Sequence, residues 1–580
     1  MRNYISNMGT LLEEKKKNRQ FLDPQLIVET WKDIEAYYID LEKRYLKDEK
    51  ALEQWLRDRS ELEAILEEDA AWRYIKMNCD TDKKELAESF NYFIAEIEPH
   101  VQKYSNILDE KIYKSGLLEK LDKRKYYVFI RSLKKRMEIF REKNLPIIAQ
   151  MQKEEQEYGN ISSQMTINYD DKELTLQQAA NYLREINRNI RQEVYELINT
   201  RREQEIDNLN EIFNSLLKKR YEVAQNADFK NYRDYRFDAL GRFDYKPEDC
   251  YEFHQSILVE VCPMVDEINK RRKAKLELDT LKPWDMEADQ DRKPPLEPFT
   301  NSRELIDKTI QCFRNIRPAY AEYLKIMDKN GYFDLDSRIG KAPGGFNYPL
   351  YESNVPFVFM NAVGNLRDLE TMVHEGGHAI HSFLSKDLEL VDFKNVPAEV
   401  AELASMSMEL ISMEHWEVFF KKKEDLIRAK RSQLEGVIKI LPWIACVDKF
   451  QHWLYLNPNH TVAEREQSWK NIYEDFDSSQ IDWSGQEISF RTQWQRQLHI
   501  FNYPFYYIEY GIAQLGAISI WKNYKTNNEK TLNAYDKALS LGYSVPISEI
   551  YETAGIKFSF SKDYIHDLMV FVKNELEKLK

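Results

Sequence analysis

The sequence contains little glycine and little proline. Its 580 residues include 17 glycines and 18 prolines. Each type makes up about 3% of the chain, where roughly 7% and 5% are usual. These low shares exclude a collagen-like chain and argue against Pro/Gly-rich disorder and a turn-dense all-β fold. Together with the 31% of charged residues, they favour a helical protein.

Cysteine is also scarce. The cysteines are odd in number, widely spread and without a Cys-x-x-Cys pair; they are Cys79, Cys250, Cys262, Cys312 and Cys446. This pattern argues against a disulfide framework and against a cysteine-only zinc site. It is typical of a protein from a reducing interior.

The sequence lacks a long apolar run. The longest, residues 440–447, contains Pro442 and is far too short to span a bilayer. The start of the chain has no apolar core of signal-peptide length before the charged run of residues 13–17. We therefore expect a soluble, cytoplasmic protein with no membrane partner.

Basic residues are outnumbered by acidic ones. The chain has 84 Lys and Arg against 98 Asp and Glu, a net charge of −14. This balance is too acidic for a general nucleic-acid binder that neutralises phosphates, so no nucleic-acid partner is expected. At roughly 150 residues per domain, the length corresponds to about four domain-sized units, enough to bury a core around an internal site.

Helical periodicity dominates the first 230 residues. Apolar side chains recur every three or four positions in residues 27–45, from Ile27 to Tyr45, and again in residues 61–77 and 86–97. Each of these segments is therefore predicted to be a helix with one apolar face packed on a core and a charged face toward solvent.

Two stretches depart from this helical pattern. An Asp-rich turn within residues 167–174 predicts a small hairpin. Thr175 and Gln178 have the spacing of a capping box for the helix that follows. The Pro-rich and charged residues 281–299 predict a long surface loop.

A further non-helical stretch, residues 331–360, joins a glycine loop to an apolar β run. The loop contains Gly344 and Gly345, and the run contains Phe357 and Phe359. Pro356 suits an edge strand or the start of a strand. An edge strand could pair with an extended peptide, although a core strand is the commoner case.

One motif carries chemistry: His374-Glu375-Gly376-Gly377-His378, an H-E-x-x-H sequence. The surrounding apolar residues follow helical spacing, so both histidines project from one face of a helix and can bind a single zinc ion. Glu375 lies about 100° round the helix and can reach a metal-bound water without being a ligand. The two glycines imply a close approach by a substrate or by another helix.

A catalytic zinc needs a third protein ligand. Asn395 and Pro397 announce another helix, which carries Glu399, Glu402 and Glu409. All three glutamates lie within about 80° on a helical wheel, so spacing alone leaves the choice open. Small neighbours that suggest tight packing favour Glu402.

These segments together resemble the thimet oligopeptidase and oligoendopeptidase F family of zinc peptidases. The resemblance lies in residues 373–383 around the motif and in residues 401–405, and it extends over about residues 331–511. It implies that Glu402 is the third ligand. It also implies that the glycine loop (Gly344, Gly345) and an edge strand (Phe357, Phe359) hold the substrate backbone.

Downstream, His499 and the tyrosines Tyr503, Tyr507 and Tyr510 resemble the family's histidine and tyrosine cluster. Pro504 can open a helix, and Tyr507 and Tyr510, three apart, then share a face. Phenol and imidazole donors can stabilise the oxyanion of peptide hydrolysis. An aromatic core is the alternative interpretation of this cluster, and Tyr506 is expected to belong to the core.

The resemblance implies an all-α fold of two helical lobes around a deep channel, with a small β-sheet beside the zinc-site helices. We place the boundary near residue 195, which gives an N-terminal lobe of residues 1–195 and a catalytic lobe of residues 196–580. Such a channel would admit short unstructured peptides and exclude folded proteins.

We therefore predict an endopeptidase with one zinc ion per chain, held by His374, His378 and Glu402. The ion polarises the scissile carbonyl and activates a water, and Glu375 is the general base. His499 with Tyr507 or Tyr510 stabilises the oxyanion, and Tyr503 contacts the substrate. Two alternatives remain: a zinc carboxypeptidase, which would need a fixed cation such as Arg491 or Arg496, and a non-catalytic helical scaffold.

Overall fold

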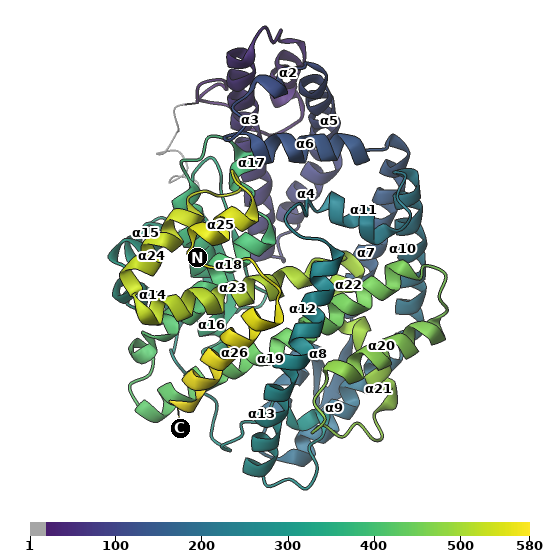
Figure 1. The fold of residues 1–580 in the computed structure, drawn as a ribbon, viewed down its shortest axis with the longest axis vertical. Helices are drawn as coiled ribbons and strands as arrows, with labels where there is room; N and C mark the ends of the chain where they lie inside the picture. The colour runs from purple at the N-terminus through teal and green to yellow at the C-terminus, as the bar shows by residue number, and fades with distance from the viewer. Residues whose placement is uncertain (1–18, 580) are drawn as a thin grey trace. The chain divides into compact units, whose positions relative to one another are not determined.

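The computed structural model describes residues 19–579 and is built mainly of helices, with a few short strands (Figure 1). This agrees with the predicted all-α class. Within the described range, none of the helices combines the length and the apolar character that a membrane span requires. The acidic and basic run of residues 13–17 lies outside the described residues.

Internal contacts divide the chain into two compact units. The first consists of the chain up to Met137 with Leu296–Ala429 and Gly516–Phe558, and the second of Glu138–Pro295, Lys430–Leu515 and the chain from Ser559 onward. The boundary predicted near residue 195 falls inside the second unit. The units are discontinuous in sequence and divide the chain differently, so the predicted lobes stay a prediction.

The first unit holds eleven helices and a three-stranded sheet among its described residues. They are α2 (Lys32–Lys43), α3 (Glu49–Cys79), α4 (Lys84–Tyr92), α5 (Glu98–Lys114), α14 (Ser302–Ile316), α15 (Pro318–Lys329), α16 (Leu366–Ser385), α17 (Val391–Lys394), α18 (Ala398–Met413), α24 (Asn528–Leu539), α25 (Ile547–Thr553), β3 (Phe333–Asp336), β4 (Phe346–Tyr348) and β5 (Phe357–Ala362).

The second unit holds eleven helices and a hairpin among its described residues. They are α7 (Leu145–Ser163), α8 (Leu176–Ala180), α9 (Arg188–Glu203), α10 (Ile206–Asn226), α11 (Tyr232–Ala239), α12 (Pro247–Glu260), α13 (Cys262–Lys275), α20 (Val462–Phe476), α21 (Glu487–Thr492), α22 (Leu498–Asn502), α26 (Lys562–Glu577), β1 (Thr166–Tyr169) and β2 (Lys172–Thr175). Three further helices run through a unit boundary: α6 (Tyr127–Ile139), α19 (Lys423–Leu456) and α23 (Tyr507–Thr526).

The predicted N-terminal helices are confirmed, with shifted ends. Helix α2 is shorter than residues 27–45, and Ile27 and Tyr45 are 74% and 85% exposed because they lie outside it. Helix α3 extends the predicted residues 61–77 in both directions. The predicted residues 86–97 form α4 and a π-helical turn, Phe93–Ile97, which continues into α5.

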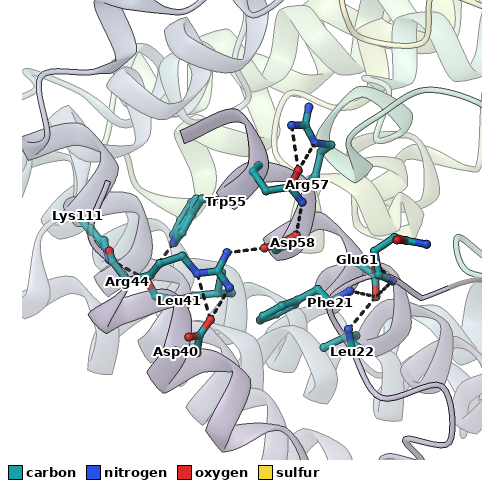
Figure 2. A network of polar contacts seen from close by, with 12 residues as sticks. Phe21, Leu22, Asp40, Leu41, Arg44, Trp55, Arg57, Asp58, Glu61 and Lys111 are labelled. Atoms are coloured by element: carbon teal, nitrogen blue, oxygen red, sulfur yellow. Dashed lines mark hydrogen bonds and ion pairs between the residues drawn. The ribbon is translucent and has the colours of Figure 1, made fainter. Parts of the chain in front are cut away.

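Buried polar contacts fix this N-terminal helical group (Figure 2). Arg44 at the end of α2 pairs with Asp58 on α3, and the indole N–H of Trp55 donates to the carbonyl of Leu41 at 2.9 Å. Lys111 of α5 donates to the same carbonyl at 2.8 Å. Glu61 accepts three successive backbone N–H groups at 3.0–3.1 Å, those of Gln20, Phe21 and Leu22. The contacts satisfy the Leu41 carbonyl in the last turn of α2 and the backbone N–H groups of the irregular segment before it.

The predicted hairpin is confirmed in the second unit. Strands β1 and β2 pair antiparallel, and the turn residues Asp170 and Asp171 both take left-handed φ angles of 52° and 57°. Two such residues make the tight turn whose twist matches a hairpin. Thr175 and Gln178 form the predicted capping box of α8. The predicted loop of residues 281–299 is largely irregular, but it is not wholly at the surface, since Leu281 and Asp285 are buried.

The edge strand that the family resemblance implies for the apolar β run is wrong, and a core strand, the commoner case, is confirmed. The sheet has the order β3-β5-β4, so β5 is the middle strand, parallel to β3 and antiparallel to β4. Pro356 precedes β5, and its missing N–H therefore falls outside the hydrogen-bonded ladder. The edge beside the glycine loop belongs to β4. The sheet contacts α16 through β4 and β5, as the predicted sheet beside the motif helix requires.

Candidate functional site

The H-E-x-x-H motif lies inside α16, as its periodicity predicts. Asn365 caps this helix and forms a capping box with Asp368. The two motif glycines lie where α16 meets its neighbours: a Cβ on Gly377 would approach Ser405 Cα of α18 to 2.6 Å, and one on Gly376 would approach the Phe313 ring to 2.7 Å. The close approach that the glycines imply is therefore protein packing, not substrate.

The three predicted ligands converge. The ring Nε2 atoms of His374 and His378 lie 3.4 Å and 4.0 Å from Oε2 of Glu402, and the three ligand atoms lie within 4.8 Å of one another. Metal–ligand distances of about 2.0–2.2 Å in a zinc tetrahedron put its ligands about 3.3 Å apart. The donor set of two imidazoles and a carboxylate fits a zinc ion with an open coordination position.

Glu409, which helical spacing also allowed as a metal ligand, lies on the other edge of the His374 ring. Its carboxylate lies 2.7 Å from Nδ1 of His374, on the ring edge opposite the ligand atom. Such a partner orients a metal-binding imidazole. Burial would lower the pKa of His374, but the hydrogen bond with Glu409 and the charges of Glu402 and Glu409 outweigh it and raise the pKa to about 9. The excess negative charge that favours this proton equally favours a cation.

Glu375 is buried beside the ligands. Its Oε2 atom has no hydrogen-bond partner among the described residues. Burial raises the pKa of Glu375 to about 7, the His374 charge lowers it, and the Glu402 and Glu409 charges raise it. A general base acts best with a pKa near the working pH. The amide of Asn347 on β4 donates to the Glu375 carbonyl at 3.2 Å, which ties the edge strand to this turn of α16.

The predicted substrate residues of the first unit fall into two groups. Gly344 has a φ of 102°, which favours glycine, and open space lies where its Cβ would be. Asn361 donates to the Gly344 carbonyl at 2.9 Å and so holds the glycine loop. Phe357 and Phe359 are 1% and 0% exposed in the core, so their predicted contact with substrate is wrong. They were assigned to an edge that β4 occupies.

His499 and the tyrosines gather in the second unit. The imidazole centroid of His499 lies 4.9 Å from the Tyr507 ring and 5.8 Å from the Tyr510 ring. Tyr503 is 50% exposed, and its ring lies 6.1 Å from His499. Tyr506, predicted to be core, is half-buried and stacks on His499 at 5.9 Å. Sequence reasoning missed this fourth tyrosine of the cluster.

The helix that carries Tyr507 and Tyr510 starts later than Pro504. Helix α23 begins at Tyr507, and Phe505 before it takes a left-handed φ of 66°. Tyr507 and Tyr510 are thus in the first turn, with ring centroids 5.5 Å apart. The prediction that they share a face holds, although the helix does not open at the proline.

Two residues that the sequence did not single out, Trp443 and Gln497, determine which ring nitrogen of His499 carries the proton. The indole N–H of Trp443 donates to Oε1 of Gln497 at 3.0 Å, and Nε2 of Gln497 lies 2.7 Å from His499 Nδ1. Because an indole nitrogen can only donate, the amide N–H₂ must face the imidazole, and Nδ1 must accept. Burial lowers the pKa of His499 to about 4. The neutral ring therefore carries its proton on Nε2.

The arginines considered for a carboxypeptidase have partners of their own. Arg491 pairs with Glu466 at 3.2 Å. The Arg496 guanidinium lies 5.2 Å from the centre of the Trp443 ring. Neither contact favours a fixed site for a substrate C-terminus.

The site residues thus form two groups, each within one unit. The metal ligands, Glu375 and the glycine loop belong to the first unit, and His499 with the tyrosines belongs to the second. The three ligand candidates lie together in the first group, apart from the buried Phe357 and Phe359, and the second group gains Tyr506. Their joint action on one substrate stays a prediction.

Curated relatives are oligopeptidases. The chain is 22% identical over 387 residues to the oligopeptidase PepF of Bacillus subtilis strain 168. This alignment covers 67% of this chain and 57% of that protein. It is 23% identical over 411 residues to the chromosomal oligoendopeptidase F of Lactococcus lactis subsp. cremoris. That alignment covers 68% of this chain and 64% of the relative. The match spans less than two thirds of either relative.

Solved structures show the same fold. PZ peptidase A with an inhibitor matches with a TM-score of 0.87 at 24% identity, over 97% of this chain and 99% of that one. An oligoendopeptidase F structure from Bacillus anthracis strain Ames matches with a TM-score of 0.82 at 21% identity, over 97% and 99%.

Family models match most of the chain. The model of the peptidase M3 N-terminal domain matches residues 21–140, and that of peptidase family M3 matches residues 181–570, which is more than half of the sequence and includes both residue groups of the site. This chain, with its H-E-x-x-H helix and its glutamate on the next long helix, belongs to peptidase family M3.

Proposed function

We propose that this protein is a zinc-dependent endopeptidase that hydrolyses internal bonds of short, unstructured peptides. The observation that carries the proposal is the convergence of His374, His378 and Glu402 around a point beside Glu375. The oligopeptidase names of the relatives support the substrate class.

The first unit carries the proposed zinc ligands and the general base that act on the attacking water. His374, His378 and Glu402 would hold a zinc ion, which would supply a Lewis acid for the scissile carbonyl and lower the pKa of a water. Glu375 takes the proton of the attacking water and passes it to the leaving amine. The carboxylate must accept and then release the proton near neutral pH.

The substrate backbone pairs with the edge strand β4. One side of β4 pairs with β5, which leaves its other side to add a strand. Asn347 of β4 is bonded to the Glu375 carbonyl, so a peptide along this edge passes the base. Gly344 and Gly345 lead into the strand and let the peptide approach the backbone closely.

The second unit supplies donors for the oxyanion. The neutral His499 presents its Nε2–H, and the Tyr507 hydroxyl stays protonated because burial raises its pKa to about 12. Such donors, fixed before the reaction, stabilise the charge that develops in the transition state. Tyr510 is the second hydroxyl donor, and the exposed Tyr503 contacts the substrate chain. A two-lobed channel that excludes folded proteins, and a cytoplasmic location, belong to the same proposal.

Product analysis tests the function. Wild-type protein is incubated with a mixed peptide library in two forms, with free C-termini and with amidated C-termini, and the fragments are identified by mass spectrometry. We expect internal cleavage of both forms and its loss after chelation of zinc. Cleavage confined to free C-termini would indicate a carboxypeptidase. No cleavage by the zinc-loaded protein would support a scaffold.

A further inference from the structure

A second set of metal-type ligands lies in the second unit, outside the site described above. Cys250 and His254 are four residues apart on α12, and Asp448 and His452 are four residues apart on α19. Residues four apart project from the same face of a helix. Both pairs therefore meet where these two helices face each other.

All four side chains are buried. Cys250 and Asp448 are 0% exposed, His452 is 2% exposed and His254 is 4% exposed. Aromatic rings surround His452: its ring centroid lies 4.8 Å from that of Tyr251 and 5.2 Å from that of Phe505. Polar groups in such surroundings are costly unless each of them is paired.

The pairing inside the cluster is incomplete. His254 Nε2 lies 2.8 Å from Asp448 Oδ2 in a hydrogen bond. His452 Nε2 lies 3.2 Å from the same carboxylate oxygen, at ion-pair distance. Asp448 Oδ1 and His452 Nδ1 have no hydrogen-bond partner among the described residues. Two unpartnered polar atoms in one buried cluster indicate a missing group.

The geometry matches a metal ion. One ligand atom from each of Cys250, Asp448 and His452 lies within 4.8 Å of the other two, and the His452–Asp448 distance of 3.2 Å is near the edge of about 3.3–3.8 Å of a zinc tetrahedron with sulfur, nitrogen and oxygen ligands. A thiolate and a carboxylate carry two negative charges, which a divalent cation neutralises. The bound site would then be uncharged overall in an apolar region.

We propose that Cys250, Asp448 and His452 bind a second divalent transition-metal ion, of the zinc type, distinct from the peptidase ion. His254 orients Asp448 through its hydrogen bond, as outer groups of metal sites do. The ion fastens α12 to α19. It also supports Phe505, which packs on His452 two residues before Tyr507.

A cavity of about 240 Å³ lies on the His254 side of the cluster. His254 lines it together with Tyr251, Gln255, Leu258, Lys449 and Phe476. Burial raises the pKa of the Cys250 thiol well above its usual value. Binding therefore releases a proton, as thiolate sites do when they take up metal.

Cobalt is a probe that separates the two ions. The full-length protein is stripped with a chelator and titrated with Co²⁺. A cobalt–thiolate bond gives a near-ultraviolet charge-transfer band, which the nitrogen and oxygen ligands of the peptidase site cannot give. We expect two cobalt ions per chain in wild-type protein, with a sulfur band that saturates at one equivalent.

Single substitutions show which residue gives the cobalt–sulfur band. Cys250→Ser should bind one cobalt and show no band, and His452→Gln should weaken the second ion at least tenfold. Cys446→Ser, a buried cysteine on α19 outside the cluster, should behave as wild type. Glu402→Ala should lose the peptidase ion and keep the band, so a failure of the proposed peptidase function would not affect this result. Wild-type protein without a sulfur band, or a band that persists in Cys250→Ser, would overturn the proposal.

Discussion

In the α16/α18 site, called the open centre below, and in the α12/α19 cluster, called the buried cluster, two ligands lie four residues apart on one helix. The third ligand, a glutamate or a cysteine, comes from the other helix. The two sites differ in exposure. The side chains of His374 and His378 are 22% and 20% exposed, whereas those of Asp448 and His452 are 0% and 2% exposed. A catalytic metal keeps an open position and a structural one is closed. Access, more than ligand type, therefore separates the two roles.

The largest expected effect comes from removing the metal ion of the open centre while the buried cluster keeps its own. Glu402→Gln would remove the proposed third ligand of an ion expected to supply several kcal/mol to the transition state. Peptide cleavage should fall on the order of 10³-fold or more, while the ion at the buried cluster stays bound. Metal analysis and kcat/KM measured on the same preparation check this. Equal loss of both ions would break the comparison.

Removing the imidazole donor should have the next largest effect. His499→Ala should lower kcat about 10²- to 10³-fold, as the loss of an oxyanion donor does, with little change in KM. Steady-state kinetics on one internally quenched peptide measure both constants. His566→Ala, at an exposed histidine that pairs with Glu260, is the control. A rise in KM alone would instead assign His499 to substrate binding.

The partner of His374 should matter less than the ligands. Glu409→Gln weakens the hydrogen bond that orients the imidazole and should lower zinc affinity about 10- to 100-fold. Activity should recover when zinc is added in excess. The buried cluster should keep its affinity. Competition with a chelator of known affinity measures both ions, and an unchanged affinity at the open centre would contradict the role given to Glu409.

Two helix glycines give opposite effects on stability. Gly377→Ala pushes a methyl group to 2.6 Å from Ser405 Cα and should destabilise the protein by about 1–3 kcal/mol. Gly436→Ala on α19 meets nothing within 4 Å and should be neutral or stabilising by up to about 1 kcal/mol. Urea unfolding of both variants measures this. A destabilised Gly436→Ala would show that packing does not explain the difference.

The smallest effect concerns pH. The folded pKa of His499 is about 4, below its ordinary value of 6.5. The unfolded chain therefore binds more protons in between, so this contribution to stability is complete above about pH 6.5 and is lost as the pH falls toward 4. His499→Gln should make the free energy of unfolding less dependent on pH in that window. An unchanged slope would show that the imidazole titrates normally.

The helical architecture and the shared helix face of His374 and His378 could be predicted because their signals are local. Periodicity places His374 and His378 on one face of α16 whatever surrounds them. The choice of Glu402 needed the family resemblance, since Glu399 and Glu409 share its side of α18. The structure separates Glu402 from Glu409 by a distance across two helices, which spacing along one helix does not contain.

Tertiary pairing explains what the sequence did not predict. Strand order made β5 central, although Pro356 before it suited an edge. Gln497 fixes the proton of His499 only because Trp443, 54 positions away, donates to its amide. The cluster of Cys250 and Asp448 depends on the packing of α12 against α19. Each of its two pairs, taken alone, has an ordinary helical spacing.

The most direct test of the central claim compares wild type with Glu375→Gln. The substitution keeps the shape of the side chain and leaves the metal ligands intact, and Glu370→Gln on the same helix is the matched control. We expect Glu375→Gln to hold as much zinc as wild type and to cleave peptides about 10²- to 10⁴-fold more slowly, with the control unchanged. Undiminished cleavage by Glu375→Gln at full zinc content would contradict the account.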